Sequence, residues 1–262
     1  MAKRQKQVAG RPPKSAPPQL FPVKALWCAP KALGGVDCCQ TCMCDDGYEY
    51  AVKLDAPDRF AAHNEWFCSN LAHRAGVQHP AFNPVSHVDG RVWFGSQWIA
   101  GEIPDWWNQV VAGAIAFPEV ADDWSRIFAF DLFINNTDRH LRNFFVLKDG
   151  ATHRMYTMDY SRAWFHNGFP PSSLPLRPTC KTILAHRWIR TNLGAAFNIA
   201  AALSALDAID TITTSNVRRI IYDQDENWLT KAEKRALFDW WDTDSKPRTA
   251  SIRLGLQNGA LF

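Results

Sequence analysis

The sequence predicts an α+β fold with two lobes, a small and mostly β lobe followed by a larger helical lobe. Strand patterns with hairpin turns fill most of the first hundred residues, and helical spacing of apolar residues dominates the later part of the chain. A length of 262 residues with 47% apolar residues favours one large core over two independent domains. We therefore divide the chain into a tail (residues 1–19), a first lobe (20–101) and a second lobe (102–262).

The first lobe is expected to contain short strands around one helix. Residues 23–28 and 48–54 have strand composition, and they flank a glycine-bearing, cysteine-rich loop that ends in an Asp-Asp-Gly turn at residues 45–47. Residues 58–75 have the apolar spacing of a helix, and a glycine follows directly as a natural stop. Residues 79–97 return to strand character around an Asp-Gly turn. This order predicts a sheet with one helix packed behind it.

The second lobe is expected to begin with a helix at residues 122–134, capped by Asp122 or Asp123. A polar loop follows at residues 135–143, and two short strands at 144–147 and 155–158 flank an Asp-Gly turn. The last helix carries a capping box in its first turn, which begins at Thr230. The predicted helices of this part are residues 181–191, 195–209, 215–223 and the helix that starts after Thr230.

Charge and hydropathy exclude some classes of protein. The first 36 residues hold seven basic and no acidic side chains, so the rest of the chain is acidic although the net charge is +3. A basic, proline-rich tail is usually a solvated chain end, and we assign it no function. No apolar run is long enough for a membrane span, and the first thirty residues lack the apolar segment of a signal peptide. We expect a cytoplasmic protein.

The densest polar segment between apolar elements is the loop that contains Asp138 and Asn143. The spacing of these two residues equals the D-x-x-x-x-N of kinase catalytic loops, in which the Asp accepts a hydroxyl proton and the Asn binds a metal ion. Asp159 follows an apolar strand and adds a hard oxygen ligand of the kind that Mg²⁺ prefers. Lys53 ends a predicted strand, and Glu65 follows twelve residues later on the predicted helix. Such a Lys can bridge nucleotide phosphates while the Glu holds it in place.

The segment 136–143 resembles a longer and more specific motif. Its sequence Asn-Thr-Asp-Arg-His-Leu-Arg-Asn is similar to the N-T-D-R-H-x-x-N loop of HipA-like serine/threonine kinases, part of which also occurs in phosphatidylinositol 3- and 4-kinases. Supporting stretches extend the resemblance over residues 30–170. The resemblance implies a two-lobed, protein-kinase-like fold and an ATP- and Mg²⁺-dependent phosphotransferase.

The resemblance also implies a role for each matching residue. Asp138 would be the catalytic base, followed by Arg139 and His140, which would meet phosphate. Asn143 and Asp159 would bind Mg²⁺. The ATP contacts would come from Lys53, from Glu65 as its partner, from the phosphate loop at Gly34 and Gly35, and from a hinge at Gln97, Trp98 and Ile99.

Several alternatives stay open beside a serine/threonine protein kinase. The phosphate loop has an acid and cysteines after its glycines, which leaves a nucleotide-binding pseudokinase as an alternative. An interaction module that uses the many tryptophans, or a lipid kinase, is a further alternative. The expected partner is a protein with a Ser or Thr acceptor, and autophosphorylation is included. Whether the chain binds an antitoxin, as full-length HipA toxins do, stays an open alternative. The acidic charge of the chain beyond its tail argues against a nucleic-acid partner.

Four cysteines lie within residues 38–44, and Cys39 and Cys42 have the spacing of half a zinc site. A structural zinc site needs four ligands, and no second pair follows at the usual distance. We therefore expect loop thiols in a reducing compartment, with structural zinc and a redox switch as open alternatives.

Overall fold

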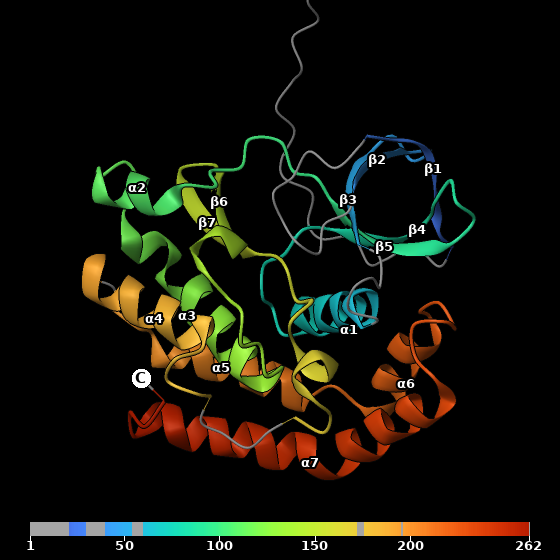
Figure 1. Ribbon diagram of the computed structural model, residues 1–262. Coiled ribbons are helices and arrows are strands. Elements are labelled where there is room, and N and C mark those ends of the chain that lie inside the picture. Colours follow the sequence, from blue (N-terminus) through green and yellow to red (C-terminus); the bar gives the residue numbers. More distant parts are fainter. Residues whose placement is uncertain (1–20, 30–39, 54–59, 172–175, 195, 262) are drawn as a thin grey trace, which may run out of the picture.

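The computed structural model describes residues 21–29, 40–53, 60–171, 176–194 and 196–261. The expected basic tail and the glycine pair Gly34 and Gly35 lie outside these ranges. Figure 1 shows a β-barrel at one end of the molecule, with helix α1 directly beneath it and the remaining helices spread below and to one side. The mixed α and β composition predicted from the sequence is confirmed.

Five short strands close into the barrel in the order β1-β2-β3-β5-β4. Neighbouring strands are antiparallel except for β1 and β4, whose parallel pairing at Val23 and Val85 closes the barrel. Gly95 is required at one close approach, because a Cβ there would lie 2.5 Å from a methyl carbon of Val85. The strands are β1 (Val23–Ala29), β2 (Gln40–Cys44), β3 (Glu49–Lys53), β4 (Phe82–Ser86) and β5 (Val92–Gln97).

The closed barrel corrects the expected first lobe, for which the sequence predicted a hairpin over a cysteine-rich loop. Residues 40–44 of that loop form strand β2, which pairs with both β1 and β3. Cys42 and Cys44 alternate with less buried neighbours and point into the barrel, where cysteine behaves as a small apolar side chain. The pattern was missed because the cysteines were interpreted as ligands or loop thiols rather than as interior residues.

Helix α1 (Ala61–Arg74) lies between the barrel and the helices at the lower right of Figure 1. Nearly all of its residues are buried, so it is packed on several sides rather than behind one sheet. Trp66 shows both contacts: its ring packs edge-on against Phe82 of β4 and against Trp228 before α7. The helix ends as predicted before Gly76, whose φ of 69° suits glycine.

Six further α-helices, one hairpin and two short 3-10 helices, Leu141–Asn143 and Trp164–Asn167, complete the described chain. Helix α3 begins at Phe117 rather than at residue 122, because Pro118 occupies the first turn, where proline is well tolerated. Helix α2 was not predicted. The elements are α2 (Trp106–Val111), α3 (Phe117–Phe133), β6 (Phe144–Asp149), β7 (Thr152–Thr157), α4 (Lys181–Asn192), α5 (Ile199–Asp210), α6 (Thr214–Tyr222) and α7 (Lys231–Gln257). The predicted capping box of α7 is confirmed, since the Glu233 N–H donates to Thr230 Oγ1 and the Thr230 N–H donates to Glu233 Oε2.

One large apolar cluster joins α1, α3 and the C-terminal helices. The tryptophan pair Trp240 and Trp241 belongs to it, and Trp106 is fully buried, so these rings are core residues and not the exposed rings that an interaction module would use. Within the described residues, no helix combines the length and the apolar character that a membrane crossing requires.

Candidate active site

The polar loop after α3 is shaped by its own Asn side chains. Asn135 has a φ of 54°, a left-handed conformation that Asn tolerates better than most residues. The side-chain amide of Asn136 donates from Nδ2 to Asp131 Oδ1 on α3 at 2.9 Å, and its Oδ1 accepts the Asp138 N–H at 3.1 Å. These bonds turn the loop back on the end of α3 and leave the Asp138 side chain 35% exposed. The loop can therefore present Asp138 to a substrate.

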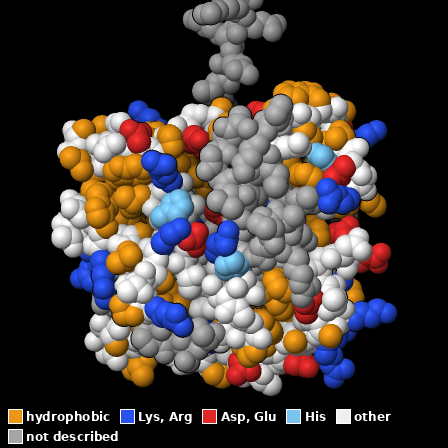
Figure 2. All heavy atoms as spheres, in the orientation of Figure 1, with side chains coloured by type: hydrophobic (Ala, Val, Ile, Leu, Met, Phe, Trp, Pro, Cys, Tyr) orange, Lys and Arg blue, Asp and Glu red, His pale blue; other side chains and the backbone are white. Residues whose placement is uncertain are grey.

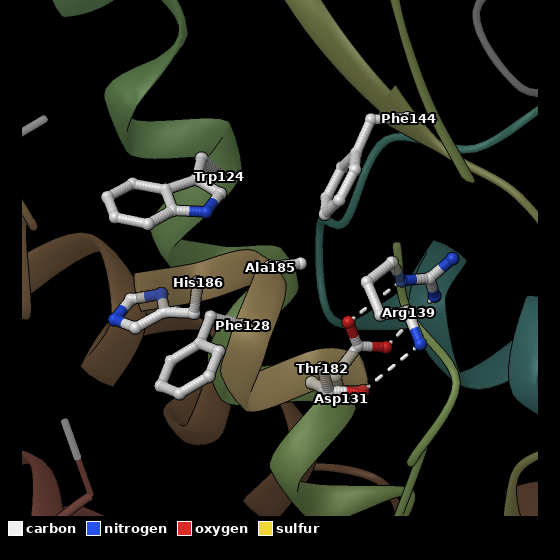
Figure 3. A pocket seen from close by; sticks show the side chains of 8 residues that line it. All are labelled: Trp124, Phe128, Asp131, Arg139, Phe144, Thr182, Ala185 and His186. Carbon is white, nitrogen blue, oxygen red and sulfur yellow. Dashed lines mark hydrogen bonds and ion pairs between the residues drawn. The ribbon is translucent and has the colours of Figure 1, made fainter. Parts of the chain in front are cut away.

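Arg139 occupies a different place from the one the motif implied. Its guanidinium is 1% exposed and forms a two-pronged ion pair with Asp131, with both N–O distances at 2.9 Å (Figure 3). It also donates to the backbone carbonyls of Met158 and Asp159. This position corrects the expected phosphate contact, because the donors of Arg139 are used inside the protein. Arg139 instead fixes the segment that carries Asp159 to α3.

The space beside this ion pair is small and lined by aromatic rings. Trp124, Phe128 and His186 stand on one side of a cavity of about 10 Å³, and Arg139 with Asp131 stands on the other (Figure 3). That volume is close to the lower limit for one water molecule. The cavity is therefore a packing feature and too small for a nucleotide.

Lys53, Glu65 and Asp159 meet in space although they are far apart in the sequence. The Lys53 ammonium lies 2.6 Å from Glu65 Oε1, 2.8 Å from Asp159 Oδ1 and 3.1 Å from the Ser161 hydroxyl. Glu65 also accepts the backbone N–H of Tyr160 at 2.8 Å. Lys53 and Glu65 are buried, whereas the Asp159 side chain is 36% exposed. The predicted Lys–Glu pair is thus formed, and Asp159 is the member that solvent can reach.

Asp159 is held ionised by this arrangement. Burial would raise the pKa of its carboxyl group, but the charge of Lys53 and the hydrogen bonds from Lys53 and Ser161 outweigh burial and hold that pKa well below its usual range. Its φ of 66° is unusual for a residue other than glycine and aims the side chain from a tight turn after β7. Asn143 lies beside it, with 3.4 Å between Asn143 Nδ2 and Asp159 Oδ2. A carboxylate and an amide side by side are a suitable donor set for Mg²⁺.

The structure adds Lys181, a residue that the sequence did not single out. Lys181 is the first residue of α4, and its ammonium lies 2.6 Å from Asp138 Oδ1. The next residue, Thr182, ties this helix end to the loop: its hydroxyl donates to the Asn136 carbonyl at 2.6 Å and accepts the Arg139 N–H at 3.1 Å. The sole signal in the sequence was a Lys at the expected start of a helix, far from the loop motif.

His140 lies at the start of the short turn Leu141–Asn143 and is half-buried. Its backbone N–H donates to Asn143 Oδ1 at 3.1 Å, which orients the Asn143 amide. Burial lowers the pKa of the imidazole. Figure 2 shows basic, acidic and histidine side chains gathered near the centre of one face, beside atoms that are not described.

Two backbone N–H groups of the expected hinge are used within the barrel. The Gln97 N–H donates to the Ala81 carbonyl and the Trp98 N–H donates to the Glu49 carbonyl, both at 2.7 Å. These two N–H groups complete the edge of the barrel, so they are not free to bind adenine. Ile99, the third expected hinge residue, follows β5 and is partly exposed. Trp98 is more exposed, at 41%.

The expectation of free loop thiols at residues 38–44 is corrected for Cys42. Cys42 forms a disulfide with Cys28 across β1 and β2, with the Cα atoms 4.0 Å apart. Cys39 lies outside the described residues. Cys42 is therefore not the free loop thiol that the sequence led us to expect.

A comparison of sequences decides the family. The sequence profile described as "HipA-like kinase" matches residues 30–172, more than half of the chain. The chain belongs to the HipA-like kinase family. Membership of the HipA-like kinases assigns it to the kinase-type phosphotransferases, as the loop motif predicted. No curated protein sequence matches the chain.

Solved structures resemble this HipA-like kinase in fold. The Helicobacter pylori proinflammatory kinase CtkA has a TM-score of 0.60 at 12% identity, covering 90% of this chain and 99% of CtkA. Shewanella oneidensis HipA, solved with HipB and operator DNA, has a TM-score of 0.46 at 10% identity, covering 79% of this chain and 60% of HipA. At these identities the CtkA likeness concerns the fold alone.

Proposed function

We propose that this HipA-like kinase is an ATP- and Mg²⁺-dependent serine/threonine protein kinase. The observation that carries the proposal is the convergence of Lys53, Glu65 and Asp159, residues from β3, α1 and the turn after β7, with Asn143 beside them. The same four residue types have defined roles in phosphoryl transfer. The barrel with α1 would then act as the small lobe and the helical part as the large lobe.

The donor set fits a hard divalent cation. Asp159 offers a partly exposed carboxylate that stays ionised, and the side-chain amide of Asn143 lies beside it, with Nδ2 toward Asp159 Oδ2. Asn143 Oδ1 accepts the His140 N–H and keeps a second lone pair that could bind the cation. When bound, Mg²⁺ would neutralise charge on the phosphate oxygens. Asp159 and Asn143 would hold the cation, and the backbone clamp of Arg139 on Met158 and Asp159 keeps the carboxylate in place.

Lys53 would bind the nucleotide phosphates. Its buried stem and the 2.6 Å bond to Glu65 fix the ammonium before any ligand arrives, so little side-chain entropy is lost on binding. Adenine would be held by groups beyond Trp98, since the N–H groups of Gln97 and Trp98 are used in the barrel.

Asp138 would act as the base. The acceptor hydroxyl oxygen attacks the terminal phosphorus, the bond from that phosphorus to the bridging oxygen breaks, and the hydroxyl proton passes to Asp138 as ADP leaves. Lys181, 2.6 Å from Asp138, places a positive charge where the transferring phosphoryl group gains negative charge. Exposure of both side chains leaves room for a substrate.

A protein acceptor is favoured over an inositol lipid. A lipid headgroup pocket calls for clustered Lys and Arg beside the site. Between residues 160 and 171 the basic side chains are Arg162 and, when protonated, His166. The aromatic side chains Trp164 and Phe165 of this segment are buried core residues and offer no surface to a peptide. The scarcity of cations alone supports the protein acceptor.

The test offers ATP labelled on its terminal phosphate to mixed cytosolic protein and, separately, to phosphoinositide vesicles, with Mg²⁺ present. Asp138→Asn serves as the blank in both arms. We expect label in protein Ser or Thr, in the enzyme itself or in added protein, that requires Asp138. Label in lipid alone would contradict the proposed acceptor, and no label in either arm would favour a pseudokinase.

A further inference from the structure

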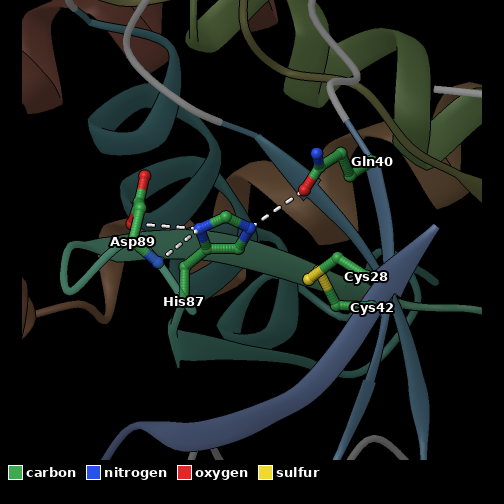
Figure 4. Close-up of a disulfide and its surroundings, with 5 residues drawn as sticks. All are labelled: Cys28, Gln40, Cys42, His87 and Asp89. Carbon is green, nitrogen blue, oxygen red and sulfur yellow. Dashed lines mark hydrogen bonds and ion pairs between the residues drawn. A yellow bond between two sulfur atoms is a disulfide. The ribbon is translucent and has the colours of Figure 1, made fainter. Parts of the chain in front are cut away.

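A cluster of metal-binding side chains lies on the barrel, separate from the candidate active site. The sulfur atoms of Cys28 and Cys42 and a ring nitrogen of His87 all lie within 4.8 Å of one another. Cys28 belongs to β1, Cys42 belongs to β2, and His87 follows the last residue of β4 (Figure 4). All three positions are therefore held by the closed barrel.

The ring of His87 is oriented by its surroundings. It is 8% exposed and stacks on Trp93, with 4.0 Å between the ring centroids and 17° between the planes. Nδ1 lies 2.9 Å from Asp89 Oδ1, and Nε2 lies 2.9 Å from Gln40 Oε1. Figure 4 shows Nε2 on the side of the ring that faces the two sulfurs. A carboxylate on the far ring nitrogen is the usual partner of a metal-bound histidine.

We propose that reduction of the Cys28–Cys42 disulfide creates a binding site for a thiophilic divalent cation such as Zn²⁺. The ligands are the two thiolates and Nε2 of His87, with a water in the fourth position. The disulfide and the metal site exclude each other, because a sulfur bonded to sulfur has no thiolate to offer. The barrel would thus carry a redox-controlled metal site, whether or not the proposed kinase activity is correct.

The chemistry balances with a dithiol as reductant. The dithiol gives two electrons and two protons to the S–S bond and becomes a cyclic disulfide, which leaves Cys28 and Cys42 as thiols. Metal binding then releases both thiol protons, and the proton that Nε2 donates to Gln40 Oε1 moves to Nδ1, where Asp89 Oδ1 accepts it, so that the Nε2 lone pair faces the metal. Two thiolates neutralise the charge of the cation, and Asp89 supports the neutral imidazole through Nδ1.

The types of ligand in this cluster determine which metal it prefers. Two sulfurs and one imidazole favour Zn²⁺ or Co²⁺ over Mg²⁺ or Ca²⁺, which prefer oxygen ligands. Cys44 lies on the same strand as Cys42, but the described cluster consists of Cys28, Cys42 and His87 and does not include it.

The test titrates Co²⁺ into the full-length protein, first oxidised and then reduced with dithiothreitol and desalted without oxygen. We expect the reduced protein to show one equivalent of thiolate–cobalt absorption that Zn²⁺ displaces, and the oxidised protein to show none. His87→Phe, which keeps a ring against Trp93, should weaken Co²⁺ binding at least about tenfold, as should Cys28→Ser. Circular dichroism checks that each variant folds.

Two control variants separate this site from others. His153 is also paired with a carboxylate, at 2.9 Å from Glu119, but among the described residues it does not belong to the cluster of Cys28, Cys42 and His87. His153→Phe should therefore bind Co²⁺ like wild type. Cys39→Ser tests the other half-site in the sequence. The inference is overturned if the reduced protein gives no thiolate–cobalt absorption, or if folded His87→Phe and Cys28→Ser bind like wild type. Loss of binding in Cys39→Ser alone would assign the metal to a different site.

Discussion

The ammonium of Lys181 lies 2.6 Å from a carboxylate oxygen of Asp138, although 43 residues separate the two in the chain. Lys181 is 59% exposed and Asp138 is 35% exposed, so the ion pair contributes little to stability. We expect Lys181 to act in the reaction instead, because its ammonium lies beside the proposed base.

Lys181→Ala should lower kcat about 100-fold, the usual loss when one preorganised charge at a transition state is removed. Lys181→Arg should recover part of the rate, and the melting temperature should stay close to wild type in both. Lys231 is the matched control, because it too is an exposed Lys at the first position of a helix. Lys231→Ala should leave kcat unchanged. Equal rates for Lys181→Ala and wild type would remove Lys181 from the site.

Lys53→Met should abolish most of the stabilisation by ATP. A ligand at 100 times its Kd stabilises the folded state by about 2.7 kcal/mol, and the shift disappears when the phosphates lose their main cation. Thermal unfolding with and without millimolar ATP and Mg²⁺ measures this for each variant against its own baseline. Lys148→Met, at an exposed strand position, should keep the full shift. An undiminished shift in Lys53→Met would place the nucleotide elsewhere.

Arg139→Met should destabilise the protein by about 3–5 kcal/mol, because it leaves Asp131 as an unpaired charge in the core. Arg235→Ala is the control: its pair with Asp239 is exposed, with an N–O distance of 3.4 Å, and should contribute less than about 0.5 kcal/mol. Urea unfolding gives both values. A loss below about 1 kcal/mol for Arg139→Met would contradict the structural role assigned to the Asp131 pair.

Stability should fall as the pH falls below about 6.5, the pKa of an unfolded histidine. Burial lowers the pKa of His63 and of His79 to about 4. Between these values the unfolded state binds more protons than the folded state, so stability rises with pH in that window, by up to about 1.4 kcal/mol per pH unit for each histidine. Urea unfolding from about pH 7 to pH 5 should show a shallower dependence in His79→Gln. An unchanged slope in that variant would contradict a buried neutral His79.

The residues that sequence reasoning brought together are those whose order and spacing match the kinase pattern. Lys53 at a strand end and Glu65 on the next helix could be paired from the pattern alone, and they lie 2.6 Å apart. Asp159 after a strand and Asn143 in the loop also meet, at 3.4 Å. In each case the sequence element around the residue limits where its side chain can lie.

The features that were missed depend on contacts between distant segments. Arg139 looks like a phosphate contact in the loop motif, and only the packing of α3 against the loop brings Asp131 to it. The Cys28–Cys42 disulfide requires the register of β1 on β2, which the cysteine spacing does not reveal. Barrel closure likewise depends on the parallel pairing of β1 with β4. No local pattern encodes these pairings.

The most direct test of the proposed site is the initial rate of phosphoryl transfer from ATP by wild type and Asp159→Asn. Asn keeps the shape of the side chain and removes the charge that would hold Mg²⁺, while Glu65 still pairs with Lys53. We predict a rate at least about 1000-fold lower in Asp159→Asn, and an equal loss in wild type when a chelator removes Mg²⁺. A folded Asp159→Asn that transfers phosphate within tenfold of wild type, or a wild-type rate that survives the chelator, would contradict the account.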